Sequence, residues 1–202
     1  MGTFLGILAG MLTLWAMGEG RRSQLPTWGR GLALAALVGL WAVDGINSLV
    51  QEATGSAPLY PPSNIIRLVT GVGNGLAISA ILYPLFHYAM WNKSDNRRVL
   101  DRASHLGVLF VAGGLLISIT LGWKTAPYLF WAITLGAAVM IVLTLLNATL
   151  LALVIHKRGF ADHYLEIVPF LAGGIAVTFL ETGGMALLRR TLSTQIPLRL
   201  AP

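Results

Sequence analysis

The stretch YLFWAITLGAAVMIVLTLLNATLLALVI, residues 128–155, decides the fold class of this chain. It carries no charged side chain, and it exceeds the roughly 20 apolar residues that a helix needs to cross a bilayer. Inside a membrane, only helices and closed β-barrels satisfy every backbone polar group, and one long uninterrupted apolar run is typical of the helix. The stretch therefore predicts a membrane-spanning helix.

Five further apolar runs lie along the rest of the sequence, separated by short polar or charged loops. The first run is short for a full span, and Arg189 and Arg190 are expected to stop the last one. We predict an all-α integral membrane bundle of about six transmembrane helices, in one domain over 1–190 followed by a short polar tail at 191–202. The flanking runs cover residues 2–17, 31–50, 64–91, 103–122 and 165–188.

The composition agrees with this fold class. Hydrophobic residues make up 55% of the 202 residues and charged residues only 11%, whereas soluble domains carry about 25% charged residues. The chain has no cysteine, which excludes a disulfide or a cysteine-ligated metal within it. The net charge of +6 comes from short basic clusters between apolar runs, so the lipid bilayer is the expected partner and nucleic acid is not.

Lysine and arginine are distributed unevenly between alternate loops. The second and fourth loops hold only Lys124, with Arg67 just inside the third apolar run. The bias predicts that the other loops face the cytoplasm and that both chain ends lie outside, although Arg189, Arg190 and Arg199 count against this orientation. The basic residues of the first, third and fifth loops are Arg21, Arg22, Arg30, Lys93, Arg97, Arg98, Arg102, Lys157 and Arg158.

Three ionisable side chains lie inside apolar runs: Asp44, Arg67 and Glu181. Each costs about 2.5 to 3.5 kcal/mol in the membrane unless it is paired or hydrated. Counted at about 1.5 Å per residue from the ends of their runs, all three fall in the same half of the membrane. We therefore predict an ion pair between Asp44 and Arg67, with Glu181 nearby as a second partner.

Polar residues extend this cluster along two helical faces. Asn47 follows Asp44 by one turn on the second run, and Arg67 shares a stripe with two asparagines on the third. Two polar stripes on consecutive helices are expected to face each other rather than lipid, which predicts a ligand or ion site. The alternative is that these side chains only hold helices together through interhelical hydrogen bonds. The candidate site residues are Asp44, Asn47, Asn64, Arg67, Asn74 and Glu181.

Glycines recur every four residues on the first and third apolar runs, a spacing that lets helix backbones approach closely. We assign these glycines to helix packing. The string GVGNG at 71–75 does not indicate a phosphate-binding loop, because no strand precedes it. The packing glycines are Gly2, Gly6, Gly10, Gly71 and Gly75.

No motif in the sequence indicates catalysis or metal binding. No Ser-His-Asp order, H-E-x-x-H motif or Walker motif occurs. The histidines lack the close spacing of a metal or haem site, so we expect no metal, whereas the sequence leaves any cofactor and any catalytic residue unknown. These histidines are His87, His105, His156 and His163.

The pair Asp44-Gly45, followed by SNIIRLVTG at 63–71, resembles an uncharacterised family of small prokaryotic polytopic membrane proteins, known only as a domain of unknown function. In that family a D-G pair precedes an S-x-N-x-x-R-x-x-[ST]-G-like stretch, which reads S-N-x-x-R-x-x-T-G here. The resemblance covers about the first 85 residues. It implies Asp44, Asn64 and Arg67 as shared positions in a multi-pass protein of the prokaryotic plasma membrane, and it implies no activity.

The family pattern also carries a C-x-x-C-x-G segment just before a helix with G-x-x-x-G. The stretch GTFLG at 2–6 resembles that helix, and Met1 stands where the cysteine segment would end. Either the protein lacks these cysteines or the sequence begins downstream of the natural first residue, and the short first run favours the second alternative. The intact mass of the natural protein distinguishes the two.

Three functions are compatible with this sequence. The first is binding or transport of a small solute or ion, with Arg67 holding an anionic group or the carboxylates carrying protons or a cation. The second is an accessory or structural subunit, in a homo-oligomer or a larger membrane complex, that packs through its glycine-rich faces. The third, a membrane-embedded redox or lipid enzyme, is least favoured because it would use the cysteine segment that this chain lacks.

Overall fold

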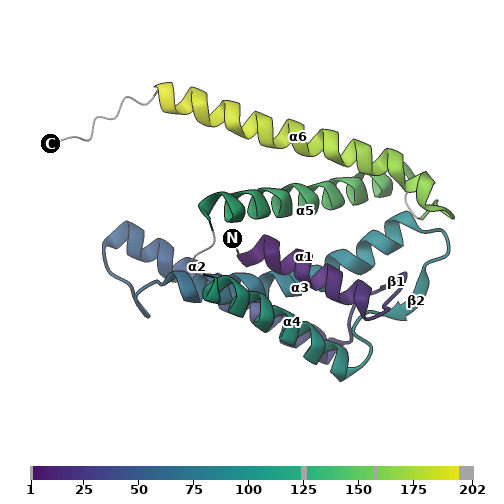
Figure 1. Ribbon diagram of the computed structural model, residues 1–202, viewed down its shortest axis with the longest axis horizontal. Coiled ribbons are helices and arrows are strands. Elements are labelled where there is room, and N and C mark those ends of the chain that lie inside the picture. The colour runs from purple at the N-terminus through teal and green to yellow at the C-terminus, as the bar shows by residue number, and fades with distance from the viewer. Residues whose placement is uncertain (1, 124–126, 157–158, 196–202) are drawn as a thin grey trace.

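The computed structural model describes residues 2–123, 127–156 and 159–195, and over these residues the protein is an all-α bundle with one small sheet (Figure 1). Each predicted apolar run forms a helix, which confirms the fold class. The elements are α1 (Gly2–Ala16), β1 (Arg22–Gln24), α2 (Trp28–Thr54), α3 (Asn64–Met90), β2 (Asp95–Arg98), α4 (Ala103–Gly122), α5 (Tyr128–His156) and α6 (Tyr164–Gln195).

Five of these helices, α2 to α6, are long and apolar enough to cross a membrane. The remaining helix, α1, has 15 residues. It is therefore about 22 Å long, shorter than the roughly 30 Å of the hydrocarbon core. The chain is thus a multi-pass membrane protein in which α1 is a short apolar helix.

The end of α6 differs from the sequence prediction. Arg189 and Arg190 do not stop the helix, which continues to Gln195, so the predicted tail at 191–202 begins inside α6. No proline or glycine interrupts the chain between these arginines and Pro197. Arginine is itself a good helix former and can extend its charged end towards water. Two consecutive arginines at the end of an apolar run therefore need not end the helix.

Helix α1 lies at the centre of the bundle, in contact with α3, α4 and α5 (Figure 1). Its glycines face the backbone of α3 directly. A Cβ atom on Gly2 would lie 2.7 Å from the carbonyl oxygen of Leu68, and one on Gly6 would lie 2.6 Å from that of Val72. No larger side chain fits at these positions without moving the helices apart. Gly10, Gly71 and Gly75 line the same interface.

Helices α5 and α6 form an antiparallel hairpin beside this central pair. Gly174 of α6 approaches the carbonyl oxygen of Thr144 on α5, where a Cβ atom would be 2.6 Å away. The hairpin joins the bundle through contacts of α5 with α1 and α3, whereas α6 packs chiefly against α5 and runs along one edge of the molecule (Figure 1). Most of α6 therefore stays exposed.

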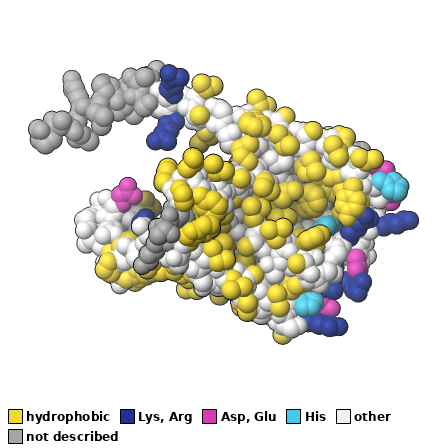
Figure 2. Space-filling view, in the orientation of Figure 1, with side chains coloured by type: hydrophobic (Ala, Val, Ile, Leu, Met, Phe, Trp, Pro, Cys, Tyr) yellow, Lys and Arg dark blue, Asp and Glu magenta, His cyan; other side chains and the backbone are white. Residues whose placement is uncertain are grey.

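Charged residues gather at one end of the bundle, on the right in the orientation of Figure 2. There β1 and β2 pair in parallel, with Arg22 opposite Asp95, and the backbone nitrogen of Asp95 donates to the carbonyl oxygen of Arg21 over 2.8 Å. This small sheet was not predicted, because its strands look like charged loops in the sequence. We call this the basic end; it carries Arg21, Arg22, Lys93, Arg97, Arg98 and Arg102.

Candidate functional site

Asp44 is a carboxylate buried inside the second helix of the chain, at the end of the bundle away from the basic end. Only 3% of its surface is exposed. Its Oδ1 accepts a hydrogen bond of 2.8 Å from the hydroxyl of Tyr60. Its Oδ2 lies 3.3 Å from Oγ1 of Thr70, whose one proton is shared with the carbonyl oxygen of Ile66 at 2.9 Å. The carboxylate thus joins α2 to the loop at 55–63 and to α3 through two neutral donors.

The hydrogen bond to Asp44 alters the acidity of Tyr60, which lies in that loop outside the membrane-spanning helices. It raises the pKa of the Tyr60 hydroxyl, because the ionised phenol would lose this bond and would face the negative carboxylate. Tyr60 therefore stays a hydrogen-bond donor to Asp44 throughout the neutral range.

Asn47 holds the same loop from one turn further along α2. Its side-chain amide donates to the carbonyl oxygen of Tyr60 over 2.8 Å and accepts from the backbone nitrogen of Leu59 over 3.1 Å. These two contacts use both ends of a fully buried amide. Asn47 thus positions the loop that brings Tyr60 to Asp44.

Arg67 does not form the predicted ion pair with Asp44. No carboxylate of the described residues lies within 4.0 Å of the Arg67 guanidinium. Thr70, one turn further along α3, is the α3 side chain that meets Asp44 instead. The carboxylate is already satisfied by two hydroxyl groups, and the guanidinium remains exposed.

Two cavities meet at Arg67. The larger, about 430 Å³, extends along Asn64 of α3 towards the end of α4. The smaller, about 250 Å³, lies between α2 and α3 and is lined by Asp44 and by Ser48, whose buried hydroxyl has no hydrogen-bond partner in the described structure. Both cavities are lined by Arg67 and by Gly2 at the start of α1. Arg67 therefore borders two separate cavities that share two lining residues.

The other predicted members of the cluster are separated from Arg67. Asn74 is buried deeper in α3 and lines neither of the two cavities. Glu181 accepts a hydrogen bond of 2.9 Å from the side chain of Asn147, which also contacts Thr178 over 3.1 Å. The prediction that Glu181 joins Asp44 and Arg67 is wrong, because α6 packs chiefly against α5 and meets α3 only near Ile167, at the opposite end of α6 from Glu181.

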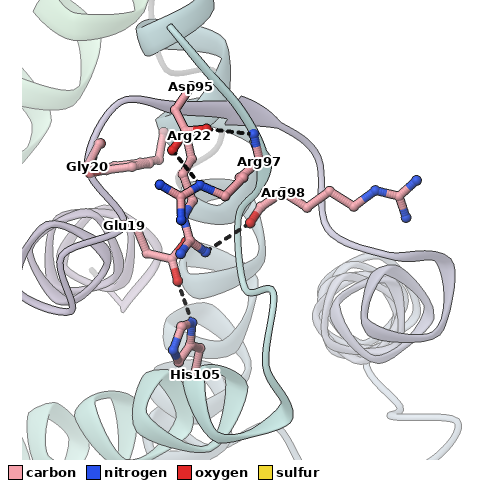
Figure 3. Close-up of polar contacts among 8 residues, drawn as sticks. Glu19, Gly20, Arg22, Asp95, Arg97, Arg98 and His105 are labelled. Atoms are coloured by element: carbon pink, nitrogen blue, oxygen red, sulfur yellow. Dashed lines mark hydrogen bonds and ion pairs between the residues drawn. The ribbon is translucent and has the colours of Figure 1, made fainter.

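Glu19, just after α1, is the most buried charged side chain of the described residues, and it was not predicted as part of a site (Figure 3). Its side chain is 0% exposed, and its Oε2 accepts from Nη1 of Arg22 over 2.6 Å. Its Oε1 faces Nδ1 of His105 at the start of α4. Arg22 Nη1 also donates to the carbonyl oxygen of Arg98 over 3.1 Å, so the cluster ties α1, both strands and α4 together.

The chain turn at 17–20 explains how Glu19 reaches the interior. Gly18 and Gly20 adopt φ angles of +70° and +56°, which glycine tolerates best. This turn reverses the chain after α1 and directs Glu19 back into the bundle, where the hydroxyl of Tyr83 donates to the carbonyl oxygen of Gly20 over 2.8 Å. A single acid between two glycines, followed by two arginines, was the available sequence signal.

Within the residues that the structure describes, no group of three or more His, Cys, Asp or Glu side chains is arranged to hold a metal ion. The site thus offers the guanidinium of Arg67 beside two cavities, together with three carboxylates, Asp44, Glu19 and Glu181, that already have hydrogen-bond partners. Comparisons with protein-family models, with curated proteins and with solved structures find no match for this chain.

Proposed function

We propose that this protein binds a small anionic solute at Arg67, in a multi-pass bundle of the prokaryotic plasma membrane. The observation that supports this proposal is an arginine inside the third helix that borders two cavities and has no acidic partner among the described residues. A charge within a membrane span is costly unless something pairs with it or hydrates it. An anion in either cavity supplies that partner.

The geometry favours an anion over a cation or a carried proton. The carboxylate of Asp44 is already engaged by Tyr60 and Thr70, whereas the guanidinium is exposed. Guanidinium groups bind carboxylates and phosphates in a bidentate manner, through two parallel N–H donors. The smaller cavity is also lined by Ser48, a further polar residue beside Arg67.

The volumes of the cavities limit the size of the solute. At about 430 and 250 Å³, they accommodate a small metabolite rather than a large amphiphile. With the basic end in the cytoplasm, as the distribution of lysine and arginine predicts, Arg67 would face the outer side of the membrane. An outward-facing solute site is the arrangement expected of a receptor or an importer.

The experiment measures thermal unfolding of the full chain in mild detergent with inorganic phosphate, acetate or succinate at constant ionic strength. We expect at least one of these anions to raise the unfolding midpoint of the wild type, because a ligand that binds only the folded state stabilises it. Arg67→Gln removes the response. Arg189→Gln, which removes an exposed positive charge from α6, keeps it.

A response that survives Arg67→Gln, or no response of the wild type to any of the three anions, would contradict the proposal. Uptake of the stabilising anion into liposomes containing the protein then separates transport from binding alone. A transporter accumulates the labelled anion in the vesicles and loses this activity in Arg67→Gln, whereas a binding protein gives no uptake above empty liposomes.

A role as an accessory subunit is the second candidate, and the exposed face of α6 favours it. Glu181 is exposed there, and Gly183 and Gly184 have open space where a side chain would project. Such a surface suits close approach of another membrane helix. Blue native electrophoresis of the wild type beside Gly184→Leu tests this role: a larger species that disappears in the variant supports it, and a monomer in both contradicts it.

A further inference from the structure

A groove separate from the two cavities at Arg67 lies towards the basic end of the molecule, on the surface between α1, α3, α5 and α6. Its volume is about 590 Å³. Apolar side chains form most of its walls, and on α1 they extend from Leu8 to Trp15, or about 10 Å of helix. Leu145 of α5 and Leu171 of α6 line the opposite wall. The groove is long and apolar enough to hold part of an acyl chain.

Aromatic rings hold the guanidinium of Arg21 where the groove reaches the basic end of the bundle. The guanidinium carbon of Arg21 lies 3.4 Å from the ring centroid of Trp91 and 5.7 Å from that of Tyr164. These stacking contacts orient the guanidinium and leave its N–H donors available. In the part of the chain that the structure describes, no carboxylate forms an ion pair with Arg21, whereas neighbouring Arg22 is neutralised by Glu19.

Two residues that line this groove, His87 and Trp91, each bury a polar atom without a partner among the described residues. Nδ1 of His87 and Nε1 of Trp91 are both buried, and neither has a hydrogen-bond partner in the described structure. Buried polar groups in proteins are usually hydrogen-bonded. Both atoms are too buried for a ligand in the groove to reach directly, so the group that a ligand's negative charge would meet at this end is Arg21.

We propose that this groove binds an anionic phospholipid, with its phosphate on Arg21 and one acyl chain along α1 and α5. The apolar walls favour a lipid over a free phosphate ion, and the unpaired guanidinium favours an anionic over a zwitterionic headgroup. Tryptophan and tyrosine are typical of the headgroup level of a membrane, which is where Trp91 and Tyr164 hold Arg21. The site is separate from Arg67, which lines cavities at the other end of α1.

Native mass spectrometry of the full chain, purified in mild detergent and supplied with dioleoyl phosphatidylglycerol or dioleoyl phosphatidylcholine, tests this inference. We expect one phosphatidylglycerol to be retained in preference to phosphatidylcholine. Arg21→Gln weakens its binding about tenfold, the loss that follows removal of a strong charge-assisted contact. Arg102→Gln, at an exposed arginine of the same basic end, leaves the affinity within about twofold.

A second variant tests the acyl chain independently of the charge. Leu145→Trp narrows the groove beside α1, so we expect weaker binding of phosphatidylglycerol with Arg21 unchanged. If Arg21→Gln fails to fold, Arg21→Lys keeps the charge but loses the planar stacking, and an intermediate affinity is expected. Equal retention of both lipids, or wild-type affinity in both Arg21→Gln and Leu145→Trp, overturns the proposal. Displacement of the lipid by equimolar inorganic phosphate also overturns it, because that result indicates a free-anion site.

Discussion

The two ends of the bundle each bury a carboxylate, but they satisfy it in different ways. Glu19, at the basic end, is paired with Arg22 and faces His105. Asp44, at the opposite end, receives hydrogen bonds from the hydroxyl groups of two described residues and from no described cation, although Arg67 lines the same cavity. Both side chains are almost fully buried, so the difference lies in their partners and not in their depth.

This difference separates a structural cluster from a candidate binding site. At the basic end the buried negative charge is compensated by the chain itself, which fixes α1, the two strands and α4. At the opposite end neutral hydroxyl groups contact the Asp44 carboxylate. The Arg67 guanidinium beside it has no acidic partner among the described residues. The proposed binding site therefore rests on Arg67, which is unpaired among the described residues and lines cavities, and not on the more buried Glu19.

We expect the largest loss of folded protein from a substitution in the interface between α1 and α3, because this interface lies between the two carboxylate sites. Gly6 of α1 contacts the backbone of α3 between Glu19 and the cavities at Gly2, so Gly6→Leu should separate the helices and disrupt both carboxylate sites. We expect no folded monomer in gel filtration in detergent. Gly136→Leu is the control, because that glycine of α5 has no atom within 4 Å of an added Cβ. A well-folded Gly6→Leu protein would show that α1 does not hold the two ends together.

Glu19→Gln breaks the charge balance at the basic end. It leaves Arg22 largely buried without a counter-charge, and loss of one partner of a buried ion pair costs about 3 kcal/mol or more. Unfolding by SDS in mild detergent measures this loss of unfolding free energy. Glu52→Gln, at an exposed acid of α2, should change it by less than about 0.5 kcal/mol. Equal values for the two variants would contradict a structural role for the Glu19 cluster.

Asp44→Asn should cost less than Glu19→Gln, because Asp44 has hydroxyl partners and no paired cation. An amide oxygen still accepts a hydrogen bond from Tyr60 or Thr70, so we expect a loss of about 1 to 2 kcal/mol in the same assay. Asp101→Asn, at an exposed loop residue, is the matched control. A loss as large as that of Glu19→Gln would mean that Asp44 is electrostatically coupled to Arg67 after all.

The smallest expected effect is a shift in the pH range over which the Tyr60 hydroxyl ionises. The pKa of Tyr60 is raised in the folded protein, so its bond to Asp44 contributes stability below the ordinary tyrosine value near 10, and that contribution is lost as the pH rises through the raised value. Asp44→Asn should move the ionisation of Tyr60 back to lower pH in the ultraviolet absorbance of tyrosinate. Tyr60→Phe assigns the signal, and an unchanged titration in Asp44→Asn would disprove the contact.

The helices could be predicted from the sequence more completely than the site. Helix α4 has the predicted bounds, and α3 and α5 differ from prediction by one residue at one end. Asp44 and Arg67 were predicted to lie together, and they do line one cavity. The predicted ion pair between them is wrong. Tyr60, the strongest donor to Asp44, lies in a proline-containing loop whose path no periodicity predicts.

The sequence by itself determined that this chain spans a membrane several times, because hydropathy over about 20 residues depends on local composition alone. Only the tertiary structure decided that Glu19 is buried, that Glu181 belongs to the α5–α6 hairpin and that Arg67 lacks an acidic partner among the described residues. Hydrogen bonds and ion pairs form only within about 3 to 4 Å. Whether two side chains come that close depends on the rotation of each helix and on the course of its loops, which are set by packing throughout the bundle.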